Sequence, residues 1–150
     1  MNRKIEFYEF GIMFLMGCFV YSLMEILARG FTHWTMTLTG GIVGILLYWL
    51  NCTSPKGTWL LQAVTGAFMI TAIEMSVGIV DNLIFKWNVW DYGDMPFNLY
   101  GQICLPFSFL WFLVCIPAQW ICRGVRHRFN FDIDDNYYSS TIYYNIPLNE

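Results

Sequence analysis

Four long apolar runs dominate the pattern of hydrophobic and polar positions along the chain. A helix needs about 20 mostly apolar residues to cross a bilayer, and the third run is longer than that, so it would tilt or protrude. The pattern therefore predicts an all-α membrane protein with four transmembrane helices. Their approximate ranges are 8–28, 36–53, 58–85 and 103–122.

The residues outside these runs predict the domain organisation and the orientation. A transmembrane domain is expected over 1–128, followed by a polar, Tyr-rich cytoplasmic tail over 129–150. Basic residues gather on the cytoplasmic side of membrane proteins. With four spans, Arg29 and Lys86 fall on one side, and six basic residues fall on the other, which predicts that both termini are cytoplasmic. These six are Arg3, Lys4, Lys56, Arg123, Arg126 and Arg128.

Composition narrows the class of protein. The 150 residues are 57% hydrophobic and only 13% charged, against about 25% charged residues in soluble domains. A net charge of −3 argues against nucleic acid as a partner. The five scattered cysteines favour packing over a disulfide framework or a zinc site, and no phosphate-binding G-x-x-x-x-G-K-[ST] motif is present. We expect the lipid bilayer as a partner, and no metal or cofactor.

Polar residues recur at helical spacing within two of the predicted spans. Lipid tails solvate apolar side chains, so these two stripes are expected to face protein or water. The first stripe is Cys18, Ser22, Glu25 and Arg29, and the second is Ala67, Thr71, Glu74, Gly78 and Asp81.

Three acidic residues in the stripes are the main candidates for a site, because a charge at the bilayer centre costs a few kcal/mol. Glu25 can pair with Arg29 four residues later, or Arg29 can instead extend to the interface. Glu74 either carries a proton and bonds across helices, or meets a cation such as Arg29 or a substrate. Asp81 is either a solvated helix end or part of the polar face of Glu74.

The loop Trp87–Pro106 reads W-N-V-W-D-Y-G-D-M-P-F-N-L-Y-G-Q-I-C-L-P and mixes two signals. Its aromatic residues are typical of a membrane interface, whereas its hydrogen-bonding residues exceed what an interface requires. Two alternatives remain open, a plain interfacial loop and a re-entrant segment buried in protein. The aromatic residues are Trp87, Trp90, Tyr92, Phe97 and Tyr100, and the polar ones are Asp91, Asp94, Asn98 and Gln102.

Glycines indicate close helix packing. Gly40 and Gly44 form a G-x-x-x-G motif that lets two helices approach closely, and Gly78 is the small residue of the second stripe. The Gly40–Gly44 face is one candidate contact between copies in a homo-oligomer.

The block W-D-Y-G-D-M-P-F-N-L-Y-G-Q-I-C-L, with Glu74 in the preceding span, resembles a family of small bacterial membrane proteins catalogued as type IV permeases of ABC transporters, of the CmpB kind. The resemblance covers about 18–122 and includes Glu25 and Arg29-Gly30. Gly93 stands where the family usually has Ser, and Gln102 stands where it usually has Arg. The loss of a basic residue at 102 weakens any anion-binding role of the loop. Matching positions are Trp90, Asp91, Tyr92, Pro96, Phe97, Asn98, Gly101, Ile103, Cys104 and Leu105.

The resemblance implies a bacterial inner-membrane protein with a permease-like role, which would need separate ATPase subunits. Our first hypothesis is a transport protein whose homo-oligomer encloses a polar pathway under the aromatic loop. One alternative is an accessory protein that binds another membrane protein or a lipid, and a second is an intramembrane enzyme acting on a lipid-linked substrate. The pathway would be lined by Glu25, Glu74 and Asp81, with Arg29, Asp91, Asn98 and Gln102 as further binding residues and Trp87, Trp90, Tyr92 and Phe97 as the gate.

Overall fold

The computed structural model describes residues 7–53 and 58–128. Each of its four long helices is apolar enough to cross a membrane, which confirms the predicted all-α membrane fold. The tail expected at 129–150 lies outside the described residues, and the cytoplasmic placement of the termini stays a prediction. The helices are α1 (Phe7–Arg29), α2 (Trp34–Thr53), α3 (Trp59–Gly78) and α4 (Leu105–Arg128).

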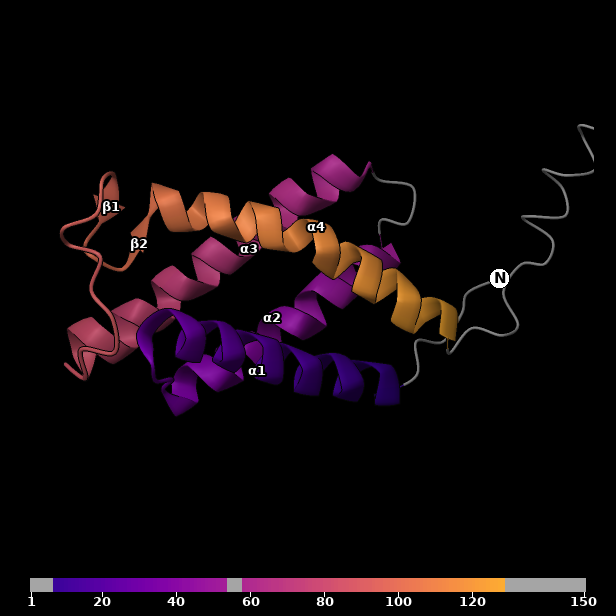
Figure 1. Cartoon of the computed structure of the whole chain (residues 1–150), viewed down its shortest axis with the longest axis horizontal. Helices are drawn as coiled ribbons and strands as arrows, with labels where there is room; N and C mark the ends of the chain where they lie inside the picture. The colour runs from indigo at the N-terminus through magenta and orange to yellow at the C-terminus, as the bar shows by residue number, and fades with distance from the viewer. Residues whose placement is uncertain (1–6, 54–57, 129–150) are drawn as a thin grey trace, which may run out of the picture.

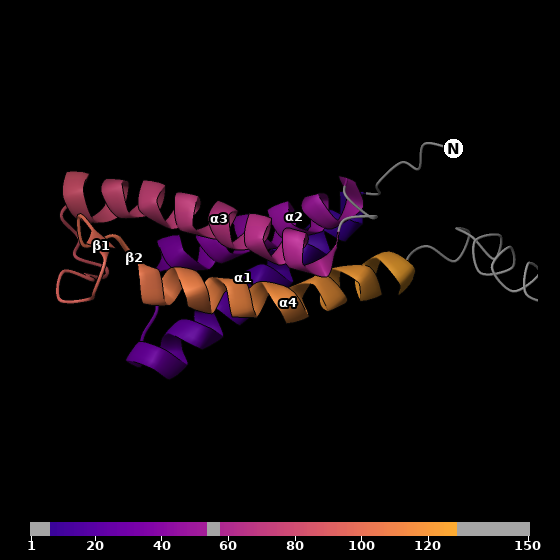
Figure 2. The ribbon, with the colours of Figure 1, turned by 90° about the horizontal axis from the view of Figure 1, so that it is seen from above.

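The helices form two closely packed pairs, with α1 against α2 and α3 against α4, whereas α1 and α4 barely touch. The α1–α2 connection and the loop before α4 lie at one end of the bundle, on the left in Figure 1. The start of α1 and the end of α4 lie at the opposite end, and Figure 2 shows the same arrangement from above. We call these the loop end and the terminal end.

Glycines bring α1 and α2 into backbone contact. A Cβ atom at Gly40 would lie 2.3 Å from Cβ of Tyr21, and one at Gly44 would lie 2.3 Å from the carbonyl oxygen of Met13. Only glycine allows helices to approach this closely. The face that we considered as a contact between copies is therefore covered by α1 of the same chain.

The third apolar run is long because α3 continues into a π-helix, η1 (Ile79–Ile84). The amide of Phe85 donates to the carbonyl oxygen of Val80 at 2.9 Å, five residues earlier. Such turns are rare and often occur at functional sites. Here η1 contains two consecutive buried polar residues, Asp81 and Asn82.

The loop between η1 and α4 is structured. Strands β1 (Asn98–Leu99) and β2 (Ile103–Cys104) pair in antiparallel fashion. Pro106 lies in the first turn of α4, where its missing N–H costs nothing. Helix α4 then continues through the basic segment 123–128, six residues beyond the span that we predicted.

Candidate functional site

The carboxylate of Glu74 lies where three helices meet. The hydroxyl of Tyr21 on α1 donates to its Oε1 at 2.7 Å, and Nε1 of Trp111 on α4 donates to its Oε2, also at 2.7 Å. The Tyr21 and Trp111 rings stack, with centroids 5.4 Å apart. The Glu74 side chain is 4% exposed. Both carboxylate oxygens thus receive a neutral donor, each from a different neighbouring helix.

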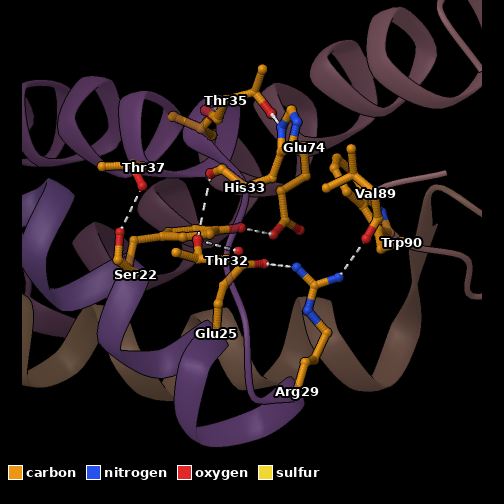
Figure 3. Close-up of polar contacts among 12 residues, drawn as sticks. Ser22, Glu25, Arg29, Thr32, His33, Thr35, Thr37, Glu74, Val89 and Trp90 are labelled. Carbon is orange, nitrogen blue, oxygen red and sulfur yellow. Dashed lines mark hydrogen bonds and ion pairs between the residues drawn. The ribbon is translucent and has the colours of Figure 1, made fainter. Parts of the chain in front are cut away.

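Arg29 pairs with Glu25 rather than with Glu74. Its other guanidinium nitrogen donates to the carbonyl oxygen of Val89 at 2.8 Å, and the hydroxyl of Thr32 donates to Oε2 of Glu25 at 2.8 Å. Figure 3 shows these groups in a row beside Glu74. Arg29 therefore ties the end of α1 to the loop, and within 7–53 and 58–128 Glu74 forms no ion pair.

Asp81 is buried, with 2% of its side chain exposed, so it is not a solvated helix end. The hydroxyl of Thr35 in α2 donates to its Oδ2 at 2.6 Å. Nδ1 of His33 lies 2.7 Å from the same hydroxyl, a contact visible in Figure 3. Asp81 therefore belongs to a second cluster, nearer the loop end than Glu74.

A buried amide network anchors the loop to η1. Nδ2 of Asn82 donates to the carbonyl oxygen of Trp90 at 2.9 Å and to Oε1 of Gln102 at 2.8 Å. Its Oδ1 accepts from the amide of Val89 at 2.7 Å, and Nε1 of Trp90 donates to the carbonyl oxygen of Gln102 at 2.9 Å. A Cβ atom at Gly78 would lie 2.6 Å from Oε1 of Gln102, so glycine leaves room for this network.

The remaining polar candidates hold the loop in shape and do not converge with Glu74. Oδ1 of the exposed Asp91 accepts from the amide of Gly93 at 2.8 Å. The side chain of Asn98 donates to the carbonyl oxygens of Gly93 and Met95, each at 2.9 Å. Gly101 has φ +69°, and a Cβ atom there would lie 2.5 Å from Oδ1 of Asp91. These contacts are local turn chemistry.

The aromatic residues of the loop divide into an inner and an outer group. Trp90 is buried, and Tyr92 stacks on Phe107 of α4 with ring centroids 4.6 Å apart. Burial raises the pKa of the Tyr92 hydroxyl above its usual value, and the charge of Glu74 adds to this effect. Phe97, just before β1, and Tyr100, in the turn between β1 and β2, are 83% and 75% exposed.

Trp87 lies on the other side of the loop. Its ring stacks on Phe85 at 4.8 Å and lies 5.4 Å from the ring of His33. It is 45% exposed, so it packs against the start of α2 while keeping one face open.

Sequence reasoning missed the partners of Glu74. Tyr21 precedes Glu25 by one helical turn and could have been found as part of the first stripe. Trp111 carries no such signal, because it lies in an aromatic run of α4, Phe107–Phe112. Only the packing of α4 against α3 shows that its indole nitrogen faces a carboxylate.

A further polar cluster at the terminal end was also missed. The hydroxyl of Tyr48 donates to Oε2 of Glu9 at 2.7 Å, and Nδ2 of Asn51 donates to Oε1 of Gln119 at 3.0 Å. All four side chains are almost completely buried. The Gln119 side-chain nitrogen has no hydrogen-bond partner among the residues that the structure describes.

An apolar groove lies between α1 and α4. Met13, Val20 and Met24 line it from α1, and Val114 and Ile121 line it from α4. Tyr21 and Trp111 also form part of its wall. The two residues that donate to Glu74 thus border a hydrophobic space and not a polar channel.

Within the described ranges, no group of three or more His, Cys, Asp or Glu side chains is arranged to hold a metal ion. The buried carboxylates are instead distributed among separate clusters.

Comparison with known proteins identifies the family. The family model described as "putative ABC-transporter type IV" matches residues 7–145. The match extends beyond 18–122 in both directions and includes most of the polar tail. No curated protein and no solved structure matched the chain. A family match over nearly the whole chain, together with four helices able to span a membrane, shows that this membrane protein belongs to the family described as "putative ABC-transporter type IV".

Proposed function

We propose that the protein takes part in transport, with Glu74 as the group that binds and releases a proton or small cation. The observation that carries this proposal is the convergence of Tyr21 and Trp111 on both oxygens of Glu74. Intramembrane carboxylates are costly, and they commonly mark ion pathways and proton relays.

The packing of the helices suggests how Glu74 would become accessible. Tyr21 and Trp111 approach it from α1 and α4, the two helices on either side of the groove. Because α1 and α4 barely touch, they can separate at little cost in packing. Separation would withdraw Tyr21 and open Oε1 of Glu74 to a cation or to water, while Trp111 would stay with the packed α3–α4 pair.

The loop would act as the gate. It closes the loop end through the amide network of Asn82 and through the bond from Arg29 to Val89. Breaking the Arg29–Val89 contact would release the loop from α1 while η1 still holds it. In this proposal Asp91, Asn98 and Gln102 keep the gate in shape.

Four helices are few for a complete pathway, so we propose a homo-oligomer that works with separate ATPase subunits. The family description names an ABC transporter, and the chain has no phosphate-binding motif. The apolar groove offers no polar route of its own. A second copy, or a partner subunit, would therefore complete the pathway in the inner membrane.

The test compares two buried glutamates in reconstituted liposomes. Glu74→Gln removes the charge and is expected to abolish proton or monovalent cation flux. Glu9→Gln makes the same change at the terminal end, where Glu9 also accepts from a tyrosine, and is expected to retain flux. The proposal would be refuted if liposomes with the wild-type protein show no flux and cells carrying Glu74→Gln are indistinguishable from wild-type cells.

A second candidate function is that of an accessory protein that binds another membrane protein. The exposed aromatic residues of the hairpin region favour it, because Phe97 and Tyr100 are largely exposed on a structured loop. A photo-crosslinking residue at 97 should then capture one dominant protein partner. The same residue at Phe68, which is 76% exposed on α3, serves as the control, and equal labelling from both positions would count against this candidate.

A further inference from the structure

Three side chains form a continuous hydrogen-bonded chain from the loop end into the bundle. Nδ1 of the half-buried His33 lies 2.7 Å from Oγ1 of Thr35. The hydroxyl of Thr35 donates to Oδ2 of Asp81 at 2.6 Å. This series of hydrogen bonds thus begins in the α1–α2 connection, passes through α2 and ends at a buried carboxylate in η1.

The direction of each hydrogen bond follows from the number of protons. A hydroxyl has a single proton to donate, and an ionised carboxylate can only accept. Since Thr35 donates to Asp81, it must accept from His33, so Nδ1 of His33 carries the proton. Neutral His33 then has its lone pair on Nε2, the ring nitrogen that takes no part in these hydrogen bonds.

We propose that His33, Thr35 and Asp81 are a proton relay that loads Asp81 from the loop end. A proton from water binds Nε2 of His33, while the Nδ1 proton passes to Oγ1 of Thr35. The original hydroxyl proton of Thr35 passes to Oδ2 of Asp81. The relay ends with neutral His33 protonated on Nε2, an intact Thr35 hydroxyl and a neutral Asp81, so one proton has entered and none is lost.

The same three side chains can stabilise both states. After transfer, the carboxylic acid of Asp81 donates to Thr35, and Thr35 donates to the free Nδ1 of His33. Every bond is kept with its direction reversed, so no heavy atom needs to move. Loading also removes a buried charge, which is favourable at membrane depth.

Two tryptophan rings pack around the His33 imidazole and restrict its orientation. Its ring lies 5.7 Å from that of Trp34 and 5.4 Å from that of Trp87. Charged groups on the described elements around the relay include the Glu25–Arg29 pair of α1, Glu74 of α3 and Lys86 after η1, and the loop carries Asp91 and Asp94. Glu25 and Arg29 are bonded to each other, so Asp81 is the charge connected to the His33 ring.

Nitrogen-15 NMR on histidine-labelled protein in detergent micelles can follow the relay. The chain has two histidines, and a His127→Asn background leaves His33 as the only signal. At alkaline pH we expect the Nδ1–H tautomer. As the pH falls, we expect conversion to the Nε2–H tautomer, together with an infrared carboxylic-acid band that is absent from Asp81→Asn.

Two variants of Thr35 test the middle step of the relay while His33 and Asp81 stay in place. Thr35→Ser keeps the hydroxyl and should reproduce the coupled change. Thr35→Val keeps the shape and should uncouple the His33 tautomer from the Asp81 band. The proposal is overturned by an Nε2–H tautomer at alkaline pH, or by a doubly protonated His33 that forms before any acid band. None of these readouts depends on flux through Glu74, so this proposal and the transport proposal can fail separately.

Discussion

The hydroxyl of Tyr21 donates a 2.7 Å hydrogen bond to Oε1 of Glu74, and this bond joins two helices that otherwise share few contacts. Helix α1 packs mainly on α2, and α3 packs mainly on α4. The Tyr21 phenol therefore helps to connect the two helix pairs, in addition to the packing of α2 on α3 and α4. In an apolar medium an unpaired polar group is costly, so this bond helps to determine how the pairs sit against each other.

Removing the Tyr21 hydroxyl should destabilise the bundle. In Tyr21→Phe, Oε1 of Glu74 loses its donor, and leaving a buried acceptor unsatisfied costs about 1–3 kcal/mol. The measurement is thermal or denaturant unfolding in detergent. Tyr100→Phe, at a residue that is 75% exposed, is the control and should change the free energy of unfolding by less than about 0.5 kcal/mol. Equal stabilities of the two variants would contradict the structure.

The contact between α1 and α2 can be tested by comparing two single glycine-to-alanine variants, one at the contact and one away from it. In Gly40→Ala the new methyl group would lie 2.3 Å from Cβ of Tyr21 and 2.6 Å from the carbonyl oxygen of Gly17. Overpacking of this kind costs about 1–3 kcal/mol. Gly11→Ala is the control, because a methyl group there would meet no atom within 4 Å, and it should stabilise α1 by about 0.5–1 kcal/mol. Similar melting temperatures for both variants would count against the packing.

The amide network should control the order of the loop. Asn82→Asp removes the side-chain N–H groups that bond to Trp90 and Gln102 and brings a charge into a buried site. We expect faster hydrogen–deuterium exchange over 86–104, with little change in α1 and α2. Asn88→Asp is the matched control in the same loop, because Asn88 is exposed and Asp also tolerates its φ of 50°. Unchanged exchange in the Asn82 variant would show that other contacts hold the loop.

The burial of Tyr92 should make the free energy of unfolding depend on pH in the alkaline range. Its folded-state pKa is raised by burial, so the folded protein holds this proton more tightly than the unfolded chain does. The stabilisation is fully present below the unfolded pKa of about 10 and is lost as the pH rises above it. Stability curves for wild type and Tyr92→Phe should therefore differ by a constant amount up to pH about 9 and then change relative to each other, with wild type losing stability faster. A difference that stays constant to higher pH would contradict the assignment.

Hydropathy was sufficient for the helices and their approximate ends. The span predicted at 8–28 corresponds to α1, and Gly30, with φ +81°, terminates it as a glycine after a helix does. These features depend on local sequence and on the thickness of the bilayer. The π-helix η1 was not predictable in this way, because its two buried polar residues are satisfied by α2 and by the loop and not by their own neighbours in sequence.

The sequence by itself determined that this is a four-helix membrane protein, and it predicted that Glu25, Glu74 and Asp81 face protein or water. It did so because apolar length and helical spacing are local properties of the chain. Only the tertiary structure decided that Arg29 binds Glu25, that Tyr21 and Trp111 bind Glu74, and that Thr35 binds Asp81. Those pairings depend on how each helix is rotated and shifted against its neighbours, and many remote contacts set that arrangement together.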